Sequence, residues 1–272
     1  MTHAADRVRR FRHLHESGCF VIPNPWDVGS AHVLVGLGFS ALATTSAGFA
    51  WSNGRRDAHP SLEETLAHFR ALAESVAVPV NGDFRDGFAT APEKVGAKVA
   101  LAVRTGIAGV SIEDSTGDPS LPLFDFPLAV ERIRAARHAI DASGTGVLLT
   151  GRSEGFVAGR PDLVETIRRL VAYAEAGAEC LYAPGIRSRE DIEAIVKAVA
   201  PRPVNVGVGS DFTTVAEMAA AGVRRISVGG ALARAAWTGF LQAAREIAER
   251  GTFSSLAPVV TGAEMERLFD PR

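Results

Sequence analysis

Several side chains that could do chemistry lie within one short stretch, 79-PVNGDFRDG-87. Asp83, Arg85 and Asp86 directly follow an apolar lead-in, and Gly87 allows the backbone to turn. Carboxylate oxygens are hard ligands that suit Mg²⁺, whereas an arginine binds anionic groups. The stretch therefore predicts either a metal site or an anion site, with a charged surface loop as the alternative.

Two adjacent acids, Glu113 and Asp114, end a second apolar run at residues 110–112. If that run is a strand, the alternation of its side chains aims one acid toward the interior. A buried, unpaired carboxylate is strongly disfavoured, so it needs a metal ion or an arginine such as Arg152 or Arg85. Arg152 could instead hold a substrate carboxylate through two parallel hydrogen bonds. We therefore expect a carboxylate-lined pocket for a small anion, and a structural salt bridge is the alternative.

Small residues in 45-TSAGFA-50 would let backbone N–H groups approach an anion, although a tight turn explains the same pattern. None of the seven histidines falls at the end of an apolar run, and neither does any lysine. A histidine-based zinc site, a histidine general base and a Schiff-base lysine are therefore disfavoured. Neither a GxSxG elbow nor a Walker loop occurs in the chain.

The residues singled out above follow eight short apolar runs that alternate with segments of helical periodicity. Runs without strict alternation are typical of strands buried on both faces of a parallel sheet. Helices are expected at 61–76, 92–106 and 161–178, with Pro161 in the first turn of the last. The predicted strands lie at residues 20–23, 39–45, 78–83, 109–114, 147–152, 179–184, 203–207 and 225–229.

This order predicts a (β/α)₈ TIM barrel that forms a single domain over residues 1–272. An open doubly wound sheet is the competitor, but no GxGxxG motif follows the first run. Barrel active sites lie at the carboxyl ends of the strands, where the acids, Arg152 and the strand-seven residue Asn205 are expected. We expect mostly Gly, Pro and Val at the opposite ends.

The net charge and hydropathy of the chain disfavour nucleic-acid-binding and membrane-spanning proteins. The formal net charge of −2 gives no field that would recruit nucleic acid, and no apolar run is long enough to span a membrane. The N-terminal stretch lacks the pattern of a secretory signal, so a cytoplasmic protein is expected. The two cysteines, Cys19 and Cys180, have no paired spacing and are expected to be reduced and buried.

The motifs together resemble the isocitrate lyase/phosphoenolpyruvate mutase superfamily across almost the whole chain. The segments that carry the resemblance, in order, are PNPWDVGSA, TTSAG, GRRDAHPSLEETL, VNGDFRDGFA, GVSIEDS, LLTGRSEGF and AGAECLYAPG. They are most similar to the short bacterial phosphonomutase-like or oxaloacetate decarboxylase-like subgroup. The resemblance implies a (β/α)₈ barrel that binds Mg²⁺, with Mn²⁺ as an alternative, and a small 2-oxo acid or its enolate.

The resemblance also implies roles for individual residues. Asp83 would be the direct metal ligand, and Asp57 and Glu113 would hold the metal's waters. Arg152 would bind the substrate carboxylate, with Arg152, Asp57 and Glu113 as the catalytic set. The remaining implied substrate-binding residues are Ser46, Ala47 and Gly48, to which we add Asn205 from its position at a strand end.

Three departures from the family pattern limit the reaction. Arg85 stands where the family usually has an acid, so it turns away, replaces the metal or weakens metal binding. The loop after Asp83 lacks the catalytic cysteine of the isocitrate and methylisocitrate lyases, and the loop after Asp114 lacks the lysine of the mutases. We therefore expect a Mg²⁺-dependent lyase or decarboxylase acting on an oxaloacetate-like acid. The alternatives are a non-catalytic 2-oxo acid binder and a carbon–phosphorus bond hydrolase acting on phosphonopyruvate.

The C-terminal part of the chain, from about residue 230 to 272, is expected to make oligomer contacts. Residues 231–256 read as one long amphipathic helix that carries Trp237 and Phe240. The resemblance implies that a following helix at 262–269 is exchanged between subunits of a homodimer or homotetramer. A helix that only packs on its own barrel is the alternative.

Overall fold

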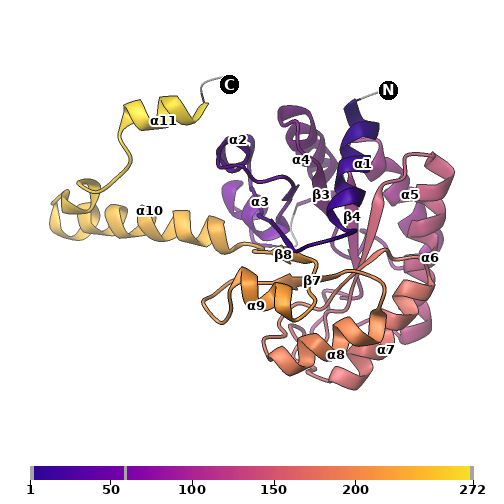
Figure 1. Ribbon diagram of the computed structural model, residues 1–272. Helices are drawn as coiled ribbons and strands as arrows, with labels where there is room; N and C mark the ends of the chain where they lie inside the picture. The colour runs from indigo at the N-terminus through magenta and orange to yellow at the C-terminus, as the bar shows by residue number, and fades with distance from the viewer. Residues whose placement is uncertain (1–2, 58–59, 270–272) are drawn as a thin grey trace.

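Eight parallel strands form the barrel at the centre of the computed structural model, which describes residues 3–57 and 60–269 (Figure 1). They pair in the order β1-β8-β7-β6-β5-β4-β3-β2, and the Ala43 N–H closes the ring by donating to the Pro23 carbonyl at 3.0 Å. The predicted (β/α)₈ barrel is confirmed. The strands are β1 (Phe20–Ile22), β2 (Leu42–Ala43), β3 (Val80–Asp83), β4 (Gly109–Glu113), β5 (Leu148–Arg152), β6 (Cys180–Tyr182), β7 (Val204–Gly207) and β8 (Arg225–Ser227).

Helices follow the strands and cover the outside of the barrel (Figure 1). The Ser61–Glu64 capping box starts α4, as its sequence pattern predicts. Pro161 lies outside α7, because Asp162 caps that helix by accepting from the Glu165 N–H. The helices between the strands are α2 (Val28–Gly36), α3 (Ser46–Ser52), α4 (Leu62–Ser75), α5 (Pro92–Val103), α6 (Phe126–Ser143), α7 (Leu163–Glu175), α8 (Arg189–Val199) and α9 (Val215–Ala220).

The N-terminal helix α1 (His3–Leu14) closes the end of the barrel at which the strands begin. Arg7 and Arg12 on this helix donate to the carbonyls of Gly106 and Gly146, which directly precede strands. Phe11 is fully buried beneath the strands. His15 lies in the turn after α1 and is buried as well.

The interior of the barrel is more polar than the apolar runs indicate. Asn81, Ser111, Thr150, Asn205 and Arg225 are all buried there. The expectation of mostly Gly, Pro and Val at the beginnings of the strands is wrong, because among the strands described only β3, β4 and β7 begin with Gly or Val and β8 begins with an arginine. Because polar groups inside a fold require partners, these side chains are connected by hydrogen bonds that are described with the site.

The C-terminal segment leaves the barrel as helix α10 (Ala231–Arg250) and extends away from it (Figure 1). The prediction of one helix over 231–256 is wrong, because Gly251 takes a left-handed conformation with φ 63° and ends the helix. A 3₁₀ turn (Ser254–Leu256) and helix α11 (Gly262–Phe269) follow, and α11 lies beside α2. In the part of the chain that the structure describes, no helix combines the length and apolar character that crossing a membrane requires.

Candidate active site

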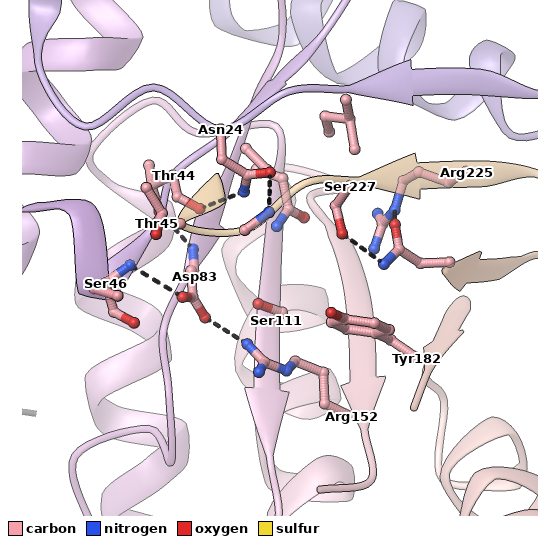
Figure 2. A pocket seen from close by; sticks show the side chains of 17 residues that line it. Asn24, Thr44, Thr45, Ser46, Asp83, Ser111, Arg152, Tyr182, Arg225 and Ser227 are labelled. Carbon is pink, nitrogen blue, oxygen red and sulfur yellow. Dashed lines mark hydrogen bonds and ion pairs between the residues drawn. The ribbon is translucent and has the colours of Figure 1, made fainter. Parts of the chain in front are cut away.

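A cavity of about 180 Å³ opens at the carboxyl ends of the strands (Figure 2). Its size suits a small molecule rather than a drug-sized ligand. Four of the predicted substrate-binding residues line it, namely Ser46, Ala47, Arg152 and Asn205, and so does the predicted metal ligand Asp83. The structure therefore brings together residues that are up to about 160 positions apart in the sequence.

Asp83 ends β3 at the wall of this cavity, between Ser46 and Arg152 (Figure 2). Its Oδ2 accepts from the Ser46 N–H at 3.2 Å, and its Oδ1 accepts from Arg152 Nη1 at 2.8 Å. The Asp83 N–H in turn donates to Thr44 Oγ1 at 2.8 Å. Groups from α3 and β5 therefore hold the carboxylate, and Thr44, directly after β2, holds the backbone of the same residue.

Arg152 ends β5 and contacts three carboxylates at once. Its guanidinium lies 2.8 Å from Asp83 Oδ1, 3.2 Å from Glu113 Oε2 and 2.9 Å from Glu154 Oε1. The Arg152 side chain is 15% exposed, and the carboxylates are similarly sheltered. One positive charge therefore faces three negative charges in a poorly solvated place.

This imbalance shifts the pKa values of the cluster. Burial raises the pKa of Glu113 well above its usual range, and the carboxylates of Glu154 and Asp83 raise it further against the opposing effect of Arg152. Burial and Asp114 likewise raise the pKa of Glu154. Burial alone would lower the pKa of Arg152, but the surrounding carboxylates outweigh it and raise that pKa well above normal. Arg152 and its three acidic partners therefore contain less positive than negative charge when all are ionised.

Asp114, the neighbour of Glu113, points away from the cavity into a different set of contacts. Its Oδ2 accepts from the Tyr173 hydroxyl at 2.7 Å and from Arg169 Nη1 at 3.0 Å, and its Oδ1 accepts from the Glu154 N–H at 2.7 Å. The two adjacent acids therefore face opposite sides of β4, as strand alternation requires. Asp114 positions the backbone that carries Glu154.

A second pocket of about 230 Å³ adjoins the first, and Ser46 and Arg152 line both. The second pocket also contains Asp57, Arg85 and Glu113. Asp83 lines the first pocket and Asp57 and Glu113 line the second, while Arg152 lines both. Arg85 lines the second pocket as well and also lies near Asp83 in a smaller hollow.

The loop after β3 holds Arg85 in an unusual backbone conformation. Arg85 and Phe88 have φ values of 49° and 57°, and Gly87, expected to turn the chain, has φ 71°. The Arg85 carbonyl accepts from the Glu113 N–H at 2.9 Å, and its guanidinium carbon lies 5.4 Å from the centre of the Phe88 ring. A left-handed arginine is strained, which is common beside functional sites.

The segment predicted to bind an anion through its backbone forms the short helix α3. Thr45 caps this helix by accepting from the Gly48 N–H at 3.2 Å, while the Ser46 N–H donates to Asp83. Gly48 does not line the cavity, because it packs against Trp26 and Thr45. Ser46 and Ala47 are the members of this segment that face it.

The carboxylates fit a divalent cation by their chemistry. Three buried carboxylates around one guanidinium leave an excess of negative charge, and carboxylate oxygens are the protein ligands that Mg²⁺ prefers. Within residues 3–57 and 60–269, no group of three or more acidic, histidine or cysteine side chains is arranged to hold a metal ion. Mg²⁺ keeps several waters and needs only one or two carboxylates, so such a group is not required.

Sequence reasoning missed several residues that line the cavity, among them Tyr182, Ser227 and Arg225. Tyr182 ends β6 and is partly buried, and the loss of hydration raises the pKa of its hydroxyl. Arg225 could have been recognised in the sequence, because a charged residue at the start of an apolar run is unusual. Asn24 also lines the cavity, where its Oδ1 accepts from the Val228 and Gly229 N–H groups after β8 and its Nδ2 donates to the Thr44 carbonyl after β2, all at 2.9 Å.

An eight-stranded barrel with carboxylates and an arginine at the carboxyl ends of its strands places its charged groups where the active sites of barrel enzymes lie. The chain belongs to the phosphoenolpyruvate phosphomutase family, whose model matches residues 11–248. This match confirms the superfamily that the motifs indicate, and the named homologues include lyases and mutases.

Three known proteins illustrate the similarity. A crystal structure from Burkholderia cenocepacia, provisionally described as a lyase/mutase, is 45% identical, covers 98% of each chain and has a TM-score of 0.96. An oxaloacetate decarboxylase from Pseudomonas aeruginosa is 28% identical over 94% of this chain and 88% of its own. The structure of an oxaloacetate acetylhydrolase with the product oxalate is 25% identical, covers 97% and 94% of the two chains, and has a TM-score of 0.86.

Proposed function

We propose that this protein is a Mg²⁺-dependent lyase that decarboxylates a small 2-oxo acid similar to oxaloacetate. The observation that carries the proposal is the arrangement around Arg152, where three buried carboxylates share one guanidinium beside a small cavity. The similarity to an oxaloacetate decarboxylase over most of both chains supports the choice of substrate class.

The metal would be held on the acidic side of the cavity. Asp83 would bind it directly, and Asp57 and Glu113 would hold its waters. When bound, Mg²⁺ polarises the keto oxygen and stabilises negative charge that develops there. Its charge would also offset the excess of carboxylates that raises the pKa of Glu113.

The substrate would be oriented by residues of this chain. Arg152 would bind the carboxylate next to the keto group, with the Ala47 N–H beside it. Decarboxylation breaks the bond between C3 and the distal carboxyl group, which leaves as CO₂, and the electron pair moves into the keto group to give an enolate. A proton added at C3 then gives the product. Tyr182 suits this step, because burial keeps its hydroxyl protonated at the cavity wall.

This reaction requires neither a cysteine acid nor a loop lysine, and both are missing from the corresponding loops. A second candidate function is a 2-oxo acid binder without catalysis. The ion pairs of Arg152 favour it, because they occupy the carboxylates that a metal would need. In that case the guanidinium takes the place of the metal in balancing the acids.

Turnover of a panel of 2-oxo acids tests the proposal. The purified protein is assayed with oxaloacetate and with phosphonopyruvate in Mg²⁺, and again in EDTA, with pyruvate and phosphate as the measured products. We expect pyruvate from oxaloacetate that depends on Mg²⁺ and exceeds the metal-catalysed background. Binding without any turnover would support the binder, and phosphate release would identify a carbon–phosphorus bond hydrolase.

We further propose that α10 and α11 form an interface between copies of this chain. The exposed apolar residues on this segment include Trp237, Phe240, Leu241, Phe253 and Phe269. So many large apolar side chains exposed on one segment are typical of an interaction surface. A homodimer or homotetramer would cover them.

A further inference from the structure

Arg225 lies at the inner end of the active-site cavity, on the opposite side of the barrel interior from the acidic cluster (Figure 2). It begins β8 and is 3% exposed. Its Nε donates to Asn205 Oδ1 at 2.8 Å, its Nη2 to Thr150 Oγ1 at 3.1 Å, and its Nη1 to His15 Nε2 at 3.3 Å. All three acceptors are uncharged groups, because burial first and then Arg225 lower the pKa of His15 to about 3.

No carboxylate among the described residues forms an ion pair with Arg225. Burial lowers its pKa, and the groups that oppose this effect are Cys180 and Tyr182, both of which are neutral at pH 7. A buried charge without a counter-charge is costly, and proteins normally pair it. A guanidinium carries five N–H donors, and the contacts above use three of them.

A second, independent feature of the same cavity is an unpaired acceptor. Asn81 on β3 is 4% exposed and lines the cavity, yet its Oδ1 has no hydrogen-bond partner among the described residues. Gly109 makes room for this oxygen, because a Cβ at residue 109 would lie 2.5 Å from it. A buried polar atom of this kind is rare in native proteins and calls for a partner.

The cavity and the pocket that adjoins it therefore have an acidic end at Arg152 and, among the described residues, an end without acids at Arg225. Arg152 is surrounded by Asp83, Glu113 and Glu154 at one end, whereas Arg225 is surrounded by neutral polar groups at the other. Ser227 is buried on the same strand as Arg225 and accepts from Asn205 Nδ2 at 3.0 Å, so it adds another neutral polar group at that end. An anionic group would be repelled by the acidic end and attracted by the inner one.

We propose that Arg225, with Asn205 and Asn81 beside it in the cavity lining, forms an inner subsite that binds the distal carboxylate of a 2-oxo acid with two carboxylates. This inference rests on the proposed function and specifies the substrate class. The carboxylate would accept from the remaining Arg225 donors, and a water bound between the ligand and Asn81 would donate to Asn81 Oδ1.

Two acids that differ only in the second charge test the inner subsite. Oxaloacetate and 2-oxobutanoate share the 2-oxo acid end and the chain length, but only oxaloacetate has a distal carboxylate. Their affinities for the wild-type protein are measured by isothermal titration in EDTA, so that the metal does not contribute. We expect oxaloacetate to bind roughly 10- to 100-fold more tightly, the effect of hydrogen bonds to a charged group.

Variants test whether Arg225 causes the tighter binding of oxaloacetate than of 2-oxobutanoate. Arg225→Gln is expected to abolish this preference, Arg225→Lys to retain part of it, and Arg224→Gln to leave it unchanged. Arg224 is the matched control because it is the adjacent arginine and donates outside the cavity to the Gly18 carbonyl. Circular dichroism verifies that each variant is folded.

Equal affinity of the wild-type protein for the two acids, or no binding of either, would overturn the inference without any variant. A preference that survives in folded Arg225→Gln would overturn it as well. Turnover is measured separately in Mg²⁺. An Arg225-dependent preference without turnover would contradict the decarboxylation and support the inner subsite.

Discussion

Arg152 Nη1 and Asp83 Oδ1 lie 2.8 Å apart, so the predicted substrate-binding arginine and the predicted metal ligand are direct partners. They come from the ends of β5 and β3, on either side of β4, which contributes Glu113 to the same guanidinium. Anything that binds Asp83 must therefore compete with Arg152 or join it. The predictions therefore begin with the balance between the positive charge of Arg152 and the acids that contact it.

Removing the cation from the cluster is expected to destabilise the fold. Arg152→Gln removes the guanidinium that Asp83, Glu113 and Glu154 share in a poorly solvated place, which costs about 3–5 kcal/mol in free energy of unfolding. Urea unfolding at pH 7.5 in EDTA measures this cost. Arg168→Gln is the control, because Arg168 is 57% exposed in its pair with Glu165 and should contribute less than about 1 kcal/mol. Equal losses in the two variants would contradict the special role of Arg152.

Arg85 is expected to weaken metal binding. It lines the same pocket as Asp57 and Glu113, and its positive charge opposes a divalent cation there. Arg85→Asn removes that charge, and asparagine tolerates the left-handed backbone with φ 49° at this position. Titration calorimetry should show Mg²⁺ binding that is tighter by about 3- to 10-fold. Arg70→Asn, on the exposed side of α4, is the control, and unchanged affinity in Arg85→Asn would refute the effect.

His15 is expected to make the fold acid-sensitive. Burial first and then Arg225 lower its pKa from 6.5 to about 3, and Arg12 and Arg224 act in the same direction. The unfolded state therefore binds a proton that the folded state does not, so the stabilisation is complete above about pH 6.5 and is lost as the pH falls toward 3. From pH 7 to 4.5 this group alone costs about 2–3 kcal/mol.

His15→Gln should flatten that part of the pH dependence. The measurement is urea unfolding at pH 7 and at pH 4.5 for the wild type, for His15→Gln and for His13→Gln. His13 is the control because it is an exposed histidine of α1 that pairs with Glu16 at the surface. Parallel losses in the wild type and His15→Gln would show that His15 does not cause the acid sensitivity.

The exposed apolar side of α10 predicts self-association. Phe240 is 61% exposed and packs edge-on against Trp237 with ring centres 5.3 Å apart. If these rings are covered in an oligomer, Phe240→Asp should shift the protein to monomers in multi-angle light scattering. Gln242→Asp tests added charge on an exposed polar residue of the same helix. A monomeric wild type would contradict the proposed interface.

The barrel and most of its site could be predicted because buried parallel strands leave a strong record in the sequence. Each predicted apolar run contains a strand, and the polar residues that follow the runs, such as Asp83 and Arg152, line the cavity. The end of α10 was placed too late, because Gly251 ends the helix while the residues after it continue an apolar pattern. The left-handed conformation of Gly251, rather than the apolar periodicity, sets the end of α10.

The partners of each charge could not be predicted. The sequence shows that Glu113, Glu154 and Arg152 lie at strand ends, but only the register of β4 against β5 places Glu113 beside Arg152. Arg225 was overlooked for the same reason, since its contacts with Asn205 and His15 join residues 20 and 210 positions apart. Such pairs follow from barrel closure rather than from any local pattern.

The most direct test of the central claim is calorimetric titration of Mg²⁺ into the EDTA-stripped protein, with and without oxalate as an enolate mimic. We predict Mg²⁺ binding that becomes tighter when oxalate is present and that is lost in Asp83→Asn, a variant of equal size without the charge. Absence of Mg²⁺ binding to the wild type, or equal binding to Asp83→Asn, would contradict a metal site at Asp83 and would favour a 2-oxo acid binder in which Arg152 alone balances the carboxylates.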